Sequence, residues 1–146
     1  MTDSTTAQYE ETKAPRDVAI DRSKRELYTE LRTTDSSPFY EVELRELFLF
    51  AMGYGRQKAG RIELPSDVHY LFGRATLTNE QEWIIKSVAV KTTRDPDVLR
   101  DERMVYTIAQ EYANSGIQKL HGKVFGPDEA LNELTSELKS VHEIDK

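Results

Sequence analysis

The sequence predicts an all-α fold, a compact single-domain bundle of about five to six helices behind a disordered N-terminal tail. Three observations support this prediction. Apolar residues recur at helical spacing, cap residues flank those segments, and 146 residues suit one domain. Such a chain buries roughly 68–70% of its unfolded surface, so its core requires no disulfide or metal. The helical domain is expected at residues 18–146, after a tail at residues 1–17.

The tail and the first helix differ in apolar content. Residues 1–17 are rich in Thr, Ser, Asp and Glu and lack apolar periodicity, which is typical of a flexible segment. Asp21 or Ser23 is placed to cap a short helix that ends near Thr33. Residues 34–38 then favour a loop because they are polar and end in proline.

A central helix is predicted from Tyr40 to Met52. Its apolar residues follow helical spacing, and its last two turns are apolar nearly all round, as in helices buried at the centre of a domain. Gly53 or Gly55 is expected to end it, because glycine readily adopts the left-handed conformation of a helix end. A basic connector follows, with a short extended segment near residues 61–65.

The second half of the chain continues the helical pattern. Residues 68–72 predict one or two helical turns, and Thr78 begins a capping box that opens a second central helix around Ile85. Asp95-Pro96 is a helix-start signal. Asp101 follows either as the cap of the next helix or as a buried functional carboxylate, and a helix end is expected at residues 114–116.

The last predicted helix begins near residue 127 and carries a leucine-rich stripe. Its apolar residues step by 3, 4 and 3 positions: Leu131, Leu134, Leu138 and Val141. The stripe lasts only about two heptads, fewer than a stable coiled coil usually shows. It is therefore expected either to dock on the chain's own core or to bind a partner protein.

Composition limits the class of protein. Cysteine is absent, and no apolar run approaches the 18 residues that suggest a membrane span. The first residues also lack the hydrophobic stretch of a secretion signal. The chain is therefore expected to be cytoplasmic and not bound to a membrane. Its net charge of −6 repels polyanions, which argues against strong non-specific nucleic-acid binding.

No catalytic or cofactor motif is apparent. The three histidines, His69, His121 and His142, lack the spacing of a metal site, and no nucleophile motif of the GxSxG type occurs. The carboxylates are scattered over polar faces. The sequence therefore predicts no catalytic residue, no metal site and no cofactor.

The glycine-containing basic segment at residues 53–61 is the candidate for nucleic-acid contact. Arg56, Lys58 and Arg61 could bind phosphates, with Tyr54 for stacking, and Arg74 could join them if the two loops meet. Binding by so few charges would be weak and sensitive to salt. Alternatively, these cations only complement the negative end of the preceding helix dipole.

Two groups of segments resemble a known family. The first comprises residues 37–39 (Ser-Pro-Phe), residues 46–54 (ELFLFAMGY), Gly60-Arg61 and Leu64, and the second is residues 108–120 (IAQEYANSGIQKL). With these, the chain resembles the small accessory proteins of DNA phosphorothioation gene clusters, the Dnd-associated group. The resemblance implies a cytosolic protein that acts beside enzymes that modify or restrict DNA through backbone sulfur. It transfers no catalytic residues.

We therefore expect a non-enzymatic accessory or adaptor protein of such an anti-phage DNA modification and restriction system. It would bind a larger protein through the last helix and contact DNA weakly through residues 56–61. A stand-alone DNA-binding regulator is the first alternative, although the helix after Thr78 is largely apolar for a recognition helix. The second alternative is an enzyme whose site is built from dispersed carboxylates such as Asp101 and Glu111.

Overall fold

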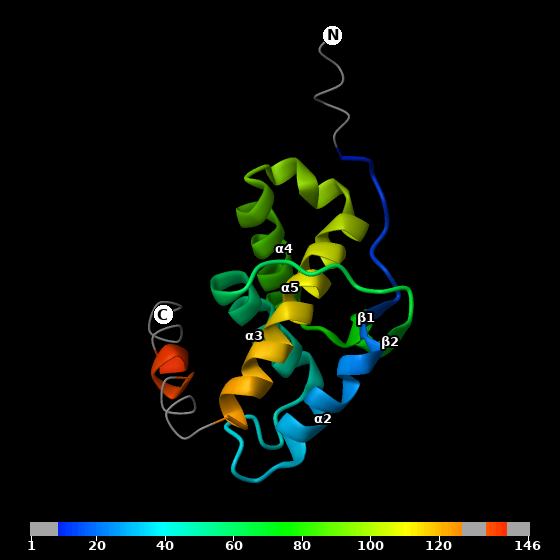
Figure 1. Ribbon diagram of the computed structural model, residues 1–146. Coiled ribbons are helices and arrows are strands. Elements are labelled where there is room, and N and C mark those ends of the chain that lie inside the picture. Colours follow the sequence, from blue (N-terminus) through cyan, green and yellow to red (C-terminus); the bar gives the residue numbers. More distant parts are fainter. Residues whose placement is uncertain (1–8, 127–133, 140–146) are drawn as a thin grey trace.

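A computed structural model describes residues 9–126 and 134–139 of the chain. In chain order its elements are β1 (Asp17–Asp21), η1 (Arg22–Lys24), α2 (Arg25–Thr33), α3 (Leu44–Lys58), β2 (Val68–Gly73), η2 (Arg74–Thr76), α4 (Asn79–Thr93), η3 (Pro96–Arg100) and α5 (Glu102–Val124). Residues 134–139 are also helical. α5 forms the axis on which α2, α3, α4 and β1 pack (Figure 1). The expectation of a mostly helical fold is confirmed.

The centre of the molecule is the contact between α3 and α5. α3 buries Leu47, Phe48, Ala51 and Met52 completely or almost completely, as the prediction of a central helix requires. The second central helix is α5, which buries residues along its whole length. The prediction of a central helix around Ile85 is wrong, because α4 buries only one face.

Two glycines explain why predicted helix ends are wrong. α3 begins at Leu44, four residues after the predicted start, and runs through Gly53 and Gly55 to Lys58. α5 likewise continues through the expected end at residues 114–116. A Cβ atom at Gly55 or Gly116 would overlap the backbone of the facing helix. These glycines therefore permit close packing inside helices and do not end them.

Three predicted caps are confirmed, whereas Asp21, one of the two candidates for the cap of the first helix, caps the short η1 and not α2, which follows Lys24. Thr78 and Gln81 form the reciprocal capping box at the start of α4. Asp95 caps η3 by accepting from the backbone N–H of Asp97, and Asp101 caps α5 by accepting from that of Met104 at 3.1 Å. At its far end α4 finishes on Arg94, which has a positive φ of 57°.

A two-stranded antiparallel sheet corrects the all-α prediction. β1 pairs with β2 in a register that places Val18 opposite Phe72 and Asp21 opposite Val68. Residues 68–72, predicted as helical turns, are therefore strand, and residues 61–65 carry no strand. β1 is fixed to α5 because the backbone N–H of Ala19 donates to the Gln110 side chain at 2.8 Å.

Residues 9–16 differ from the flexible tail expected over residues 1–17. Tyr9 is buried, and the Thr12 hydroxyl donates to the Asp101 carboxylate at 2.6 Å. The backbone N–H of Ala14 donates to Glu102 at 3.3 Å. This segment therefore lies against the start of α5, whereas residues 1–8 lie outside the described part of the chain. None of the helices in the described ranges has the length and apolar composition to cross a membrane.

Candidate interaction site

The candidate nucleic-acid residues at the end of α3 face an acid of the chain itself. Glu137 accepts a hydrogen bond from the Tyr54 hydroxyl at 3.3 Å and lies 3.4 Å from the Lys58 ammonium. Lys123 of α5 approaches the same carboxylate at 3.9 Å. Tyr54 is also buried, which leaves no exposed ring face for stacking on a base. This end of α3 is an internal contact in the structure.

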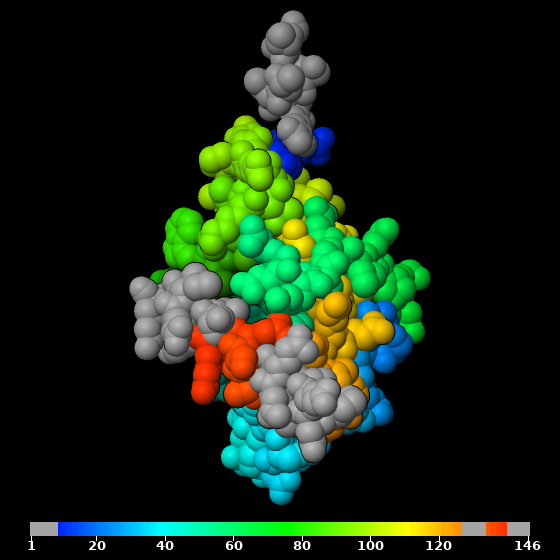
Figure 2. Space-filling model, turned by 60° about the vertical axis from the view of Figure 1, so that its left-hand side comes forward, coloured from blue at the N-terminus to red at the C-terminus, as the bar shows by residue number. Residues whose placement is uncertain are grey.

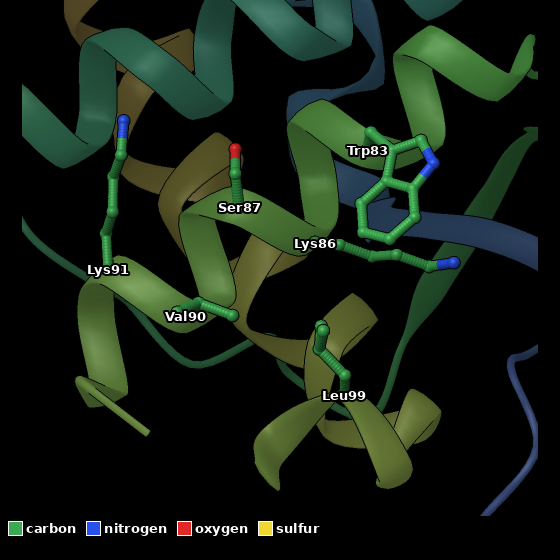
Figure 3. A pocket seen from close by; sticks show the side chains of 6 residues that line it. All are labelled: Trp83, Lys86, Ser87, Val90, Lys91 and Leu99. Atoms are coloured by element: carbon green, nitrogen blue, oxygen red, sulfur yellow. The ribbon is translucent and has the colours of Figure 1, made fainter. Parts of the chain in front are cut away.

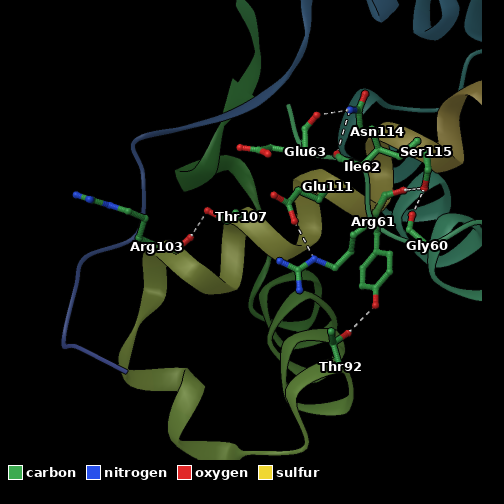
Figure 4. Close-up of polar contacts among 11 residues, drawn as sticks. Gly60, Arg61, Ile62, Glu63, Thr92, Arg103, Thr107, Glu111, Asn114 and Ser115 are labelled. Carbon is green, nitrogen blue, oxygen red and sulfur yellow. Dashed lines mark hydrogen bonds and ion pairs between the residues drawn. The ribbon is translucent and has the colours of Figure 1, made fainter. Parts of the chain in front are cut away.

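Arg61 lies in a segment that is fixed along α5. Its guanidinium donates to Glu111 at 2.8 Å, and the backbone N–H of Ile62 donates to the Glu111 carbonyl at 3.1 Å (Figure 4). The Asn114 amide donates to the Ile62 carbonyl at 3.1 Å, and the Ser115 hydroxyl donates to the Gly60 carbonyl. Residues 60–63 are therefore held against α5 by hydrogen bonds and an ion pair.

The remaining two candidates belong to different elements, Arg56 to α3 and Arg74 to η2. Arg74 follows β2 and donates to the Pro15 carbonyl at 2.9 Å, so it supports the N-terminal segment. Arg56 is exposed on α3, and within the described residues its side chain has neither an ion pair nor a hydrogen bond. Of the five predicted contact residues, four thus have interactions inside the chain.

The candidate partner-binding stripe is only partly described. Leu134 is fully buried, and Leu138 packs against the core, whereas Leu131 and Val141 lie outside the described residues. Figure 2 shows residues 134–139, in red, beside the teal surface of α3. The described half of the stripe therefore faces the chain's own core.

The carboxylates considered for a reaction centre have structural partners. Among the described residues, no group of three or more His, Asp or Glu side chains is arranged to hold a metal. Asp101 serves as a helix cap, and Glu111 pairs with Arg61. Burial, with nearby Glu82, raises the pKa of Tyr106 to about 12, so its phenol stays neutral at physiological pH.

α4 presents an exposed stripe that the sequence reasoning missed. Its exposed residues fall at helical spacing: Glu80, Trp83, Ile84, Ser87, Lys91 and Arg94. Trp83 is 60% exposed and Ile84 is 47% exposed. Two adjacent large apolar side chains on one helix face are unusual when they have no cover, and such patches commonly mark interaction sites.

A groove of about 270 Å³ runs beside this stripe, between α4 and η3. Its walls are almost entirely apolar, and its lining residues are Trp83, Lys86, Ser87, Val90, Lys91 and Leu99. Figure 3 shows the α4 side chains on one side and Leu99 on the other. The Lys86 ammonium lies 4.7 Å from the centre of the Trp83 ring, as in a cation–π contact.

The sequence contained a signal for this site, and it was misread. Apolar residues all round a helix can mean that other elements cover it on every side, or that it awaits a partner. Trp83 and Ile84 were assigned to the first case. The alternative could have been found from Lys86, which interrupts the apolar residues of this helix, and from Lys91, which directly follows the last of them, because lysine is unsuited to a buried helix.

A second cleft, of about 560 Å³, lies between α2 and α5 and carries polar groups that are already paired. The Lys24 ammonium donates to the Asn114 carbonyl at 2.9 Å, and burial lowers the pKa of this lysine. His121 lies 2.6 Å from Glu30. These interactions make the α4 groove the stronger candidate.

Comparison with known families assigns the chain. A family model described as DNA sulphur modification system-associated protein 4 matches residues 17–145. The chain belongs to this family. No curated protein and no solved structure matches it.

Membership of the DNA sulphur modification-associated family confirms the suspected resemblance to Dnd-associated accessory proteins. The segments that carried the resemblance lie mainly where α3 meets α5. Residues 46–54 belong to α3 and residues 108–120 to α5, while Gly60 and Arg61 contact α5. These residues explain the family's fold better than its activity, because they pack helices together.

Proposed function

We propose that the protein is a non-enzymatic accessory protein of a prokaryotic DNA sulphur modification system, acting in the cytoplasm as an adaptor that binds a larger protein of that system. The family match over residues 17–145 carries this proposal, since the family is associated with such systems. The phosphorothioation and anti-phage roles of the system belong to the proposal.

The arrangement of the polar residues supports a role without catalysis. The carboxylates considered for a reaction centre, Asp101 and Glu111, are engaged by Thr12 and Arg61 respectively. Asp101 caps α5 and Glu111 lies ten positions further along it, and neither residue lines either of the clefts described above. A reaction centre would require groups that converge on a shared cavity.

The face of α4 supports the role in protein binding. Trp83 and Ile84 are exposed beside an apolar groove, and exposed aromatic residues are the type that dominates the energy of protein interfaces. Leu134 is buried inside the chain. We therefore propose α4 as the main surface for the partner protein and the last helix as a second surface.

Direct DNA contact is a secondary part of the proposal. Glu137 and Glu111 neutralise Lys58 and Arg61, which leaves Arg56 as the least engaged of the predicted residues. A single exposed cation without an acidic partner among these candidates, on a chain with a net charge of −6, supports only weak, salt-sensitive binding. A gel-shift assay at low and moderate salt distinguishes such weak binding from that of a DNA-binding regulator, which would retain its affinity for DNA at moderate salt.

Co-purification tests the adaptor function. The tagged full chain is co-expressed with the products of the neighbouring DNA sulphur modification genes, and retained proteins are identified. We expect one larger protein to be retained. Trp83→Ala should reduce its retention by at least tenfold, as expected for loss of a central interface residue.

Tyr70→Ala is the matched control for this substitution. Tyr70 on β2 is 64% exposed, almost the same fraction as Trp83, but it does not line the α4 groove. Its replacement should leave retention unchanged. If none of the neighbouring gene products is retained by the unmodified chain, the proposed function is wrong.

A further inference from the structure

The ionisable residues that line the α4 groove have one sign, although acidic residues also occur on α4 and η3 outside that lining. Lys86 and Lys91 are the ionisable residues of its lining, and no carboxylate belongs to that lining. The whole chain, in contrast, carries a net charge of −6. The groove therefore combines apolar walls with two lysines on an acidic protein, and unlike Lys24 and His121 of the second cleft these lysines have no hydrogen bond or ion pair within the described residues.

The groove has a direction along the helix. Trp83 lies near the first turns of α4, whereas Lys91 and Arg94 lie at its C-terminal end. Cations at this end also favour the helix dipole, a role that needs no ligand. The dipole does not explain the exposed indole near the other end of the same helix. The combination matches a ligand that has an apolar side chain at one end and acidic residues towards the other.

The size and polarity of the groove argue against other ligands. Its volume of about 270 Å³ is below the roughly 300–1,000 Å³ of pockets that enclose small molecules. A nucleic acid would stack a base on Trp83, but the Lys86 ammonium is placed over the ring. The negative charge of the chain would also repel the phosphates.

We propose that the α4–η3 groove binds an acidic segment of the partner protein, which inserts a large apolar side chain beside Trp83 and places carboxylates against Lys86 and Lys91. This inference rests on the proposed adaptor function and specifies the chemistry of the partner. Charge pairs at the rim set orientation and specificity, and the apolar contact supplies most of the affinity.

Trp83 provides a direct measurement, because it is the chain's single tryptophan. Two synthetic peptides of equal length are titrated into the full chain, one with glutamates and one with lysines around the same phenylalanine. We expect the acidic peptide to shift the tryptophan emission to shorter wavelength, since the exposed indole becomes covered. The basic peptide should leave the emission unchanged.

Charge reversal tests the role of the lysines. The double variant Lys86→Glu, Lys91→Glu should weaken binding of the acidic peptide about tenfold and should bind the basic peptide instead. The control variant Lys119→Glu, Lys139→Glu changes the same total charge at exposed positions outside the groove. It should bind the acidic peptide like the unmodified chain. Thermal unfolding of each variant confirms that it is folded.

The outcomes separate this inference from the proposed function. The inference would be overturned by equal responses to both peptides or by no response to either. It would also be overturned if a single-stranded oligonucleotide, or self-association of the chain, caused the emission shift. It is also overturned if the co-purified partner is retained equally by the lysine double variant, in which case the adaptor function stands. Failure to retain any partner instead removes the adaptor function.

Discussion

Gly116 of α5 lies against the backbone carbonyl of Ala51 in α3, at the point where the two helices cross. A second contact of the same kind places Gly55 of α3 against the carbonyl of Tyr112 in α5. The absence of a side chain at each glycine lets the two backbones touch. The central pair of helices is thus joined by two reciprocal backbone contacts, one contributed from each side.

Adding a methyl group at either contact should destabilise the protein. In Gly116→Ala or Gly55→Ala the new Cβ would overlap a backbone carbonyl, which cannot move without separating the helices. We expect the free energy of unfolding to fall by about 3 kcal/mol or more, as measured by urea denaturation. Gly53→Ala is the control because nothing lies within 4 Å of its Cβ position. It should gain about 0.5–1 kcal/mol from higher helix propensity.

Removing the hydroxyl of Tyr28 should not harm the fold. Tyr28 is 1% exposed, and its hydroxyl has no hydrogen-bond partner within the described residues. A buried unpaired hydroxyl costs free energy, and the same burial raises the pKa of this phenol. Tyr28→Phe should therefore raise the thermal unfolding midpoint, by an amount that corresponds to a gain of about 1 kcal/mol in the free energy of unfolding. A lower midpoint would mean that the hydroxyl has a favourable partner.

Substitutions of Asp101 distinguish a structural role of its carboxylate from a catalytic role. Asp101→Ala removes the cap of α5 and the bond to Thr12, so it should cost about 1–2 kcal/mol of unfolding free energy. Asp101→Asn keeps an oxygen for the cap and should cost less. If Asp101→Asn folds normally but loses the biological activity of the system, the enzyme alternative is supported.

The buried leucine of the last helix tests which way that helix faces. Leu134 is 0% exposed, so Leu134→Ala should lower the free energy of unfolding by about 2–5 kcal/mol. Leu138→Ala, at a partly buried position, should cost less. Unchanged stability in Leu134→Ala together with loss of partner retention would instead place this stripe on the partner protein.

Local signals in the sequence were sufficient for three of the helix starts. Thr78, Asp95 and Asp101 were predicted as caps and act as caps, because a cap depends only on residues within one turn. The predictions that helices end at Gly55 and Gly116 are wrong. Glycine serves both to end a helix and to allow two helices to touch, and the second use depends on a segment far away in the chain.

The sheet and the candidate site also depended on distant residues. Val18 and Ile20 alternate as a buried strand does, but their partner strand begins at Val68, and nothing local links the two. The exposure of Trp83 likewise depends on which elements cover α4. A pattern of apolar residues identifies a helix that could be buried, and only the packing shows which face remains open.

Arg94, at the end of α4, has an unfavourable backbone conformation. It adopts a left-handed conformation at the end of α4, which costs a non-glycine residue about 1 kcal/mol. Arg94→Gly should therefore make the protein more resistant to heat, and it removes a cation at the C-terminal end of α4, just beyond the lining of the groove. If the proposed acidic segment extends past Lys91, peptide affinity should fall as the thermal midpoint rises, which would mean that a strained residue is kept at this helix end for its charge.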